Sequence, residues 1–65
     1  MTQVANATDI ENATKAVHSA QFLVSELRAL MRTDNLLLSE LALRDLESAV
    51  EIETHLKRIL MVLHG

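Results

Sequence analysis

The chain has 65 residues, no Cys and a net charge of −3 at neutral pH. This length allows one small domain, and a domain of this size buries only about 60% of the surface that its unfolded chain exposes. The absence of Cys excludes disulfide bonds and thiolate metal sites, so association with another chain is the remaining way to complete a core. The acidic balance argues against direct nucleic-acid binding, because contact with phosphates requires a basic surface.

The composition predicts an all-α fold. Hydrophobic residues make up 49% of the chain, Pro is absent and the single Gly is the last residue, so the turns of a sheet have no suitable residues. The first residues lack the basic start and the apolar run that are typical of a signal peptide. The longest apolar run, Ile59 to Leu63, is too short to cross a membrane. We therefore expect a cytoplasmic protein without membrane contact.

The first part of the chain predicts a flexible tail over residues 1–7 and a helix over about 9–32. The sequence Thr8-Asp9-Ile10-Glu11 has the pattern of a capping box, in which Thr8 caps the helix and Glu11 reaches back to it. Apolar residues then recur at alternating spacings of three and four, which is typical of a helix packed at a shallow angle on another helix. These residues are Ile10, Ala13, Val17, Ala20, Val24, Leu27 and Met31.

The heptad pattern ends at the polar stretch after Met31. Asp34 occupies the next core position, and Asp and Asn compete with helix through bonds to their own backbone. We therefore place a turn at about 33–35 and a second helix at about 36–64. A short turn between two helices of similar length predicts an antiparallel hairpin formed by residues 8–65.

The second helix is expected to have a very broad apolar side and a narrow polar strip. Two pairs spaced four apart, Glu40 with Arg44 and Glu53 with Lys57, are expected to stabilise it. Glu53, Lys57 and Asp45 interrupt the apolar side. They either flank the dimer seam and set its register, or form a binding surface that uses charge.

One partner helix cannot cover so broad an apolar side, and large exposed apolar patches mark interfaces. The sequence therefore predicts a homodimer, in which two hairpins form a four-helix bundle with two-fold symmetry. The expected dimer core consists of Val17, Val24, Leu27, Met31, Leu46, Ala49, Leu56, Ile59, Leu60 and Leu63.

The residues that carry chemistry predict neither catalysis nor a bound metal or cofactor. Of the three histidines, His55 lies four residues after Glu51, but both fall on the polar strip rather than toward a core. No Cys nucleophile exists, and a phosphate-binding loop is impossible with one terminal Gly. We therefore expect a binding protein and not an enzyme.

Two features are candidate partner-binding surfaces. Phe22, the only aromatic residue, falls almost opposite the apolar stripe of the first helix, where an exposed aromatic either is incidental or anchors a protein contact. The polar strip of the second helix is either a solvated surface or a site for a basic partner. Its candidate residues are Glu40, Arg44, Glu47 and Glu51.

Three segments carry a resemblance to a known family. Ala7 to Val17, Leu27 to Met31 and His55 to Leu63 resemble the small quorum-sensing anti-activators encoded by Pseudomonas phages, over nearly the whole chain. The resemblance implies a dimeric helical hairpin in the host cytoplasm. It implies binding to a LuxR-type transcriptional activator, which is kept from DNA, and inhibition of a type IV pilus assembly ATPase.

Two alternatives stay open. The expected architecture is similar to that of Rop-type plasmid copy-number regulators, which are dimeric hairpins that bind paired RNA loops. In that function Lys15, Phe22 and Arg32 would contact RNA, although few other basic residues share their face. The other alternative is a structural module whose only role is oligomerisation.

Overall fold

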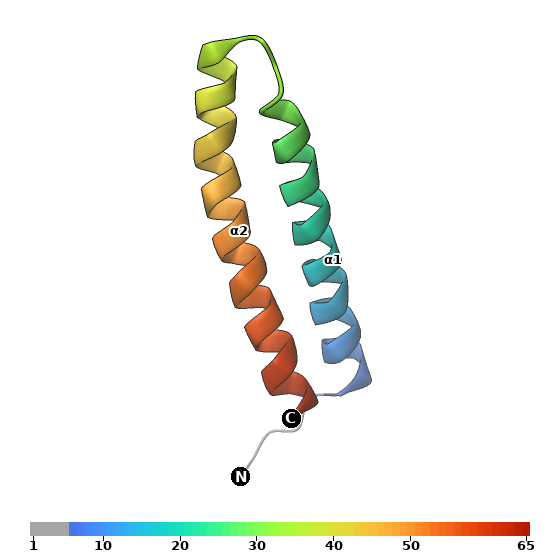
Figure 1. Ribbon diagram of the computed structural model, residues 1–65. Helices are drawn as coiled ribbons and strands as arrows, with labels where there is room; N and C mark the ends of the chain where they lie inside the picture. Colours follow the sequence, from blue (N-terminus) through green and yellow to red (C-terminus); the bar gives the residue numbers. More distant parts are fainter. Residues whose placement is uncertain (1–5) are drawn as a thin grey trace.

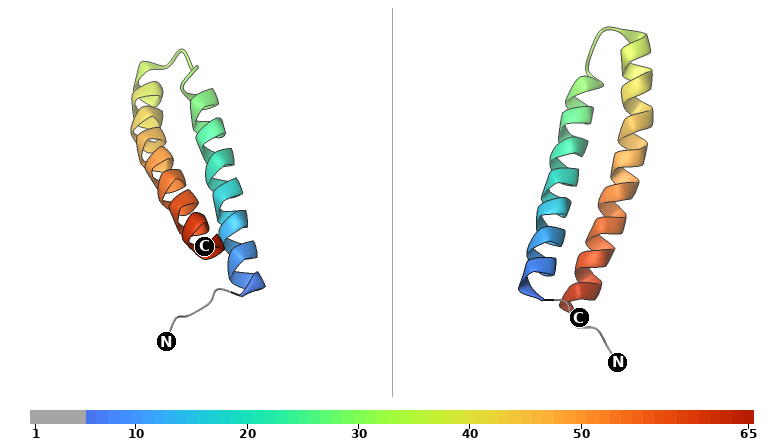
Figure 2. Two further views of the ribbon diagram at one scale, coloured as in Figure 1. Left: turned by 60° about the horizontal axis from the view of Figure 1, so that its bottom comes forward. Right: turned by 180° about the vertical axis from the view of Figure 1, so that it is seen from behind.

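The computed structural model describes residues 6–65, which form two helices joined by a short turn (Figure 1). Helix α1 spans Ala7–Leu30 and helix α2 spans Leu36–His64. The helices lie side by side and run in opposite directions, so the start of α1 and the end of α2 share one end of the molecule (Figures 1 and 2). The predicted all-α antiparallel hairpin is confirmed. Of the tail predicted over 1–7, residues 1–5 lie outside the described part of the chain.

Helix α1 begins earlier than the sequence predicted, because Asn6 and not Thr8 caps it. The Asn6 side chain accepts a 2.8 Å hydrogen bond from the backbone N–H of Asp9, whose carboxylate accepts a 3.4 Å bond from the backbone N–H of Asn6. The predicted capping box of Thr8 and Glu11 is therefore wrong. Asn is a better N-cap than Thr, and an acidic residue three positions later completes the reciprocal pair. Glu11 instead forms a 3.1 Å ion pair with Lys15.

The turn is closed by side chains as well as by backbone. Helix α1 ends at Leu30, after which the backbone tightens into bonds between residues three apart. The Asn35 side chain accepts a 3.0 Å hydrogen bond from the backbone N–H of Leu38 and so caps α2. The Ser39 hydroxyl donates a 3.4 Å bond to the carbonyl of Met31. The Ser39–Met31 bond connects α2 to the end of α1 across the turn.

Removing the Asn35 cap should destabilise the protein measurably. Asn35→Ala leaves the backbone N–H of Leu38 without its side-chain partner, and loss of such a cap costs about 1 kcal/mol. Denaturant unfolding at one fixed protein concentration measures the change, because association makes stability depend on concentration. Gln21→Ala, an exposed substitution on the polar side of α1, is the control. Unchanged stability of Asn35→Ala would contradict this assignment of the cap.

The helices meet along one heptad seam, which we call the hairpin seam. The α1 side of the seam is the predicted heptad, and every one of its residues is buried or half-buried. On α2 the buried and half-buried positions follow the same alternation of three and four. They are Ser39, Ala42, Leu46, Ala49, Glu53, Leu56, Leu60 and Leu63. The burial pattern thus fixes which side of each helix faces the other.

The hairpin seam buries only small side chains. Its five buried residues are Val17, Ala20, Val24, Ala42 and Ala49, and among the described residues no side chain is fully buried. The molecule measures 53 × 16 × 11 Å with a radius of gyration of 15.2 Å. A compact domain of this length has a radius of gyration of about 11 Å. One hairpin therefore lacks the large buried side chains that supply most of the stability of a small domain.

Candidate protein-binding surfaces

One side of the hairpin carries a group of exposed large apolar side chains, which we call the apolar face. Leu23 and Ile52 lie together there, because both line one shallow groove across the two helices. Ile59 and Val62 line a second groove on the same side of α2, close to its end. The face is completed by residues at heptad spacing from these. Its members are Leu23, Leu30, Leu38, Leu41, Ile52, Ile59 and Val62.

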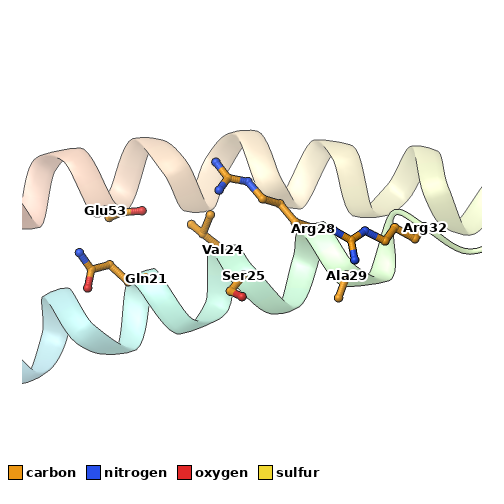
Figure 3. Close-up of a pocket in the computed structure, with 7 residues that line it drawn as sticks. All are labelled: Gln21, Val24, Ser25, Arg28, Ala29, Arg32 and Glu53. Atoms are coloured by element: carbon orange, nitrogen blue, oxygen red, sulfur yellow. The ribbon is translucent and has the colours of Figure 1, made fainter.

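The opposite side of the hairpin seam is polar. A groove there is lined mainly by Gln21, Ser25, Arg28 and Arg32 of α1 and the adjoining turn, and by Glu53 of α2. In Figure 3 the Arg28 side chain extends toward α2 across this groove. The two sides of the hairpin therefore differ in chemistry, and the apolar face has the larger group of exposed apolar side chains, a surface that water solvates poorly.

Glu53 is the only charged residue on the hairpin seam. Its side chain is 17% exposed and forms a 2.8 Å ion pair with Lys57, as the sequence predicted. The other expected pair, Glu40 with Arg44, is not among the ion pairs of residues 6–65. Of the three residues that interrupt the apolar side of α2, Glu53 thus lies on the hairpin seam itself.

Phe22 points away from α2. It comes directly before Leu23 and two residues before the buried Val24, so it falls on the back of α1 and is 64% exposed. Lys15, seven residues earlier, lies on the same side of the helix but is paired with Glu11. An aromatic side chain at so exposed a position is available to a partner without any rearrangement of the hairpin.

The predicted acidic strip lies on the back of α2. Glu40, Arg44, Glu47 and Glu51 are all exposed and occupy the side of α2 that faces away from α1. Phe22 faces outward from the other helix, so one hairpin does not bring it together with these residues. The two predicted features are separate surfaces on opposite edges of the molecule.

The residues predicted to form a dimer core divide into two groups. Ile59 is exposed on the apolar face, whereas the other nine lie on the hairpin seam. Within one chain those nine pack against the other helix of the same hairpin. Their contribution to a dimer stays a prediction.

The remaining candidate groups are dispersed. His18, His55 and His64 are exposed, and in residues 6–65 no three His, Cys, Asp or Glu side chains gather as metal ligands do. Neither α1 nor α2 is long and apolar enough to cross a membrane.

Comparisons of the chain with protein-family models, curated proteins and solved structures find no match.

Proposed function

We propose that the chain is a non-enzymatic binding protein that works as a homodimer of hairpins. The observation that carries this proposal is the inverted distribution of its apolar side chains. Among residues 6–65 the buried residues are Ala and Val, whereas thirteen large hydrophobic residues are exposed. Seven of them form the apolar face, and large exposed apolar patches mark interfaces. A second copy covers this face most simply, because two apolar faces in contact give a symmetric four-helix bundle.

The surfaces that stay outside such a bundle support a role in binding another protein. Phe22 is a large exposed aromatic side chain, the residue type that most often anchors an interface. The acidic strip of Glu40, Glu47 and Glu51 complements a basic surface, such as the DNA-binding surface of a transcription factor. We therefore propose an inhibitor that covers such a surface and prevents DNA binding.

The regulator that we propose as partner is a LuxR-type transcriptional activator. Its support is the resemblance of the chain to the phage-encoded anti-activators, together with the acidic outer strip. By the same resemblance, a type IV pilus assembly ATPase is a second proposed partner. Separate outer surfaces on the two edges of the hairpin are compatible with two different partners.

Phe22→Ala should weaken the inhibitor without unfolding it. Phe22 packs outside the hairpin seam, so stability should change by at most about 0.5 kcal/mol. If Phe22 anchors the contact, binding loses more than about 1 kcal/mol, which requires about five times more protein for the same effect. The measurement is release of a LuxR-type activator from its promoter DNA in a gel-shift titration.

Ser25→Ala, an exposed substitution on the polar side of α1, is the matched control and should titrate like the wild type. Reversal of Glu47 and Glu51 to Lys should slow association and change its salt dependence. Failure of the wild-type protein to release the activator would refute this partner. Equal release by a folded Phe22→Ala variant would place the working surface elsewhere.

A further inference from the structure

Helix α2 carries a second heptad stripe beside the hairpin seam, which we call the outer stripe. Its residues alternate in spacing between three and four, as in the hairpin seam, but all are exposed in one hairpin. Leu38 and Leu41 lie at one end of the stripe, and Ile59 and Val62 lie at the other. Polar residues fall only in its middle. The full stripe is Leu38, Leu41, Asp45, Ser48, Ile52, His55, Ile59 and Val62.

The outer stripe is complementary to itself when read in the reverse direction. Helix α2 is 29 residues long, so two copies in antiparallel contact overlap completely when Val50 marks their common centre. In that register each stripe residue meets one at the same distance from Val50 on the other side. The pairs are Leu38 with Val62, Leu41 with Ile59, Asp45 with His55, and Ser48 with Ile52.

The pair of Asp45 with His55 adds a polar contact to the complementarity of two outer stripes in this register. This register would set the Asp45 carboxylate of one copy opposite His55 of the second copy, whose ring N–H is a hydrogen-bond donor, and the two-fold axis would create this contact twice. On its own helix, His55 has Glu51 four residues before it and Arg58 three residues after it. No charged residue of α1 lines the grooves to which Asp45 and His55 belong. The Asp45 carboxylate of the outer stripe is therefore matched to an N–H donor.

Helix α1 fits the same two-fold axis independently. Leu23 shares a groove with Ala49 and Ile52, so it lies at the level of Val50. An axis at that level brings Leu23 against Leu23 of the second copy. Ala16 and Leu30 lie seven residues before and after Leu23, so each meets the other across the axis. A large side chain is thus matched to a small one, as close packing requires.

The other two-fold arrangement places both turns at one end and sets α2 against α1 of the second copy. The outer stripe would then face the corresponding side of α1, where Asn12, Ser19 and Glu26 interrupt the apolar residues. Leu and Ile side chains would be buried against polar groups without partners, which is unfavourable. In the antiparallel register the apolar ends of the outer stripe meet each other instead, and Asn12, Ser19 and Glu26 face α1 of the second copy.

We infer that two copies of this chain associate with their turns at opposite ends, α2 against α2, through the self-complementary outer stripe and the Asp45–His55 contacts. This inference rests on the proposed dimer and specifies its geometry.

The same geometry determines where the partner surfaces lie in the dimer. Both α1 helices lie on one edge of the bundle and both α2 helices on the other. The two Phe22 side chains therefore share one edge, and the two acidic strips share the opposite edge.

Cysteine cross-linking tests the register cleanly, because the chain has no Cys of its own. Leu41 and Ile59 are 18 residues apart on α2, a span of about 27 Å that a short bis-maleimide cannot bridge within one chain. The double variant Leu41→Cys with Ile59→Cys should cross-link into covalent dimers, whereas either single variant should not. Leu23→Cys alone should cross-link, because it meets its own copy at the axis.

The outcomes separate the geometry from the dimer itself. Sedimentation of each variant before the reaction reports whether a dimer is present. Cross-linking of Leu41→Cys alone would overturn the antiparallel register, and a dimer in which the double variant does not cross-link would also overturn it. A folded monomer in every variant would instead refute the proposed dimer on which the register rests.

Charge reversal tests the Asp45–His55 contact. His55→Glu sets two pairs of like charges across the interface and should weaken dimerisation by about tenfold or more. Adding Asp45→Lys to His55→Glu restores opposite charges in the same register and should recover affinity to within about threefold. Thr54→Glu is the control, because it places the same charge near the same neighbours, Glu51 and Arg58, outside the outer stripe. No recovery in the double variant would overturn the contact.

Discussion

Replacing Ile52 by Asp should dissociate the protein into single hairpins and lower its stability sharply. Ile52 is 53% exposed in one hairpin, so in a monomer the change would cost no more than about 0.5 kcal/mol. In a symmetric dimer the same change introduces two carboxylates into the apolar interface. Each unpaired buried charge costs about 3–5 kcal/mol or must take up a proton. Sedimentation and circular dichroism at the same protein concentration measure both effects.

The matched control for this substitution is Thr54→Asp. Thr54 is exposed on α2, two residues from Ile52 but outside the apolar face, so the same charge there should leave the dimer intact. An Ile52→Asp variant with wild-type mass and stability would show that the apolar face is not an interface. The contrast between the two variants therefore separates burial in a dimer from a general effect of added charge.

Ala49→Leu should destabilise the hairpin from inside by about 1–3 kcal/mol. Ala49 is 3% exposed on the hairpin seam, and the separation of the helices is set by small residues such as Ala20 and Ala42. Three additional carbon atoms there force the helices apart or push side chains off their preferred rotamers. Denaturant unfolding of the variant measures the loss.

Ala29→Leu is the control for Ala49→Leu, since it adds the same atoms at an exposed position of α1. It should leave the free energy of unfolding within about 0.5 kcal/mol of the wild type. If Ala49→Leu were equally harmless, close approach of the two helices at Ala49 would be refuted.

The helical hairpin was predictable because several local signals agree. The heptad that starts at Ile10 defines one side of the first helix without a break, and the structure buries that same side. Asp34 and Asn35 mark the turn, since both bond to nearby backbone and interrupt the heptad. The predicted start of α1 was wrong, because Asn6 as well as Thr8 is a capable cap and only Thr8 was considered. Only the reciprocal bond from Asp9 decides between them.

The side of α2 that packs against α1 could not be predicted from the sequence pattern. Its apolar residues surround more than half of the helix, so hydrophobicity alone does not indicate which of them face α1. The structure places Ser39 and Glu53 on the hairpin seam and leaves Ile52 and Ile59 outside it. A signal was available, because 39, 46, 53 and 60 follow at intervals of seven. It was obscured because two of those residues are polar.

The candidate surfaces were predictable only as exposed positions. Placing Phe22 opposite the heptad of α1 predicts that it faces outward, and the structure places it there. That Phe22 and the acidic strip occupy opposite edges depends on how α1 and α2 face each other, which no local pattern encodes. The polar groove around Arg28 and Glu53 was not predicted, because its residues come from both helices.

Sedimentation equilibrium at micromolar concentration tests the central claim most directly. A hairpin with its largest side chains exposed is expected to sediment as a dimer, with a mass of twice 7.2 kDa. Dilution should then cause dissociation and loss of helical signal together, because folding and association are linked. A fully helical species with a mass of 7.2 kDa at that concentration would contradict the proposal that two hairpins complete each other's core.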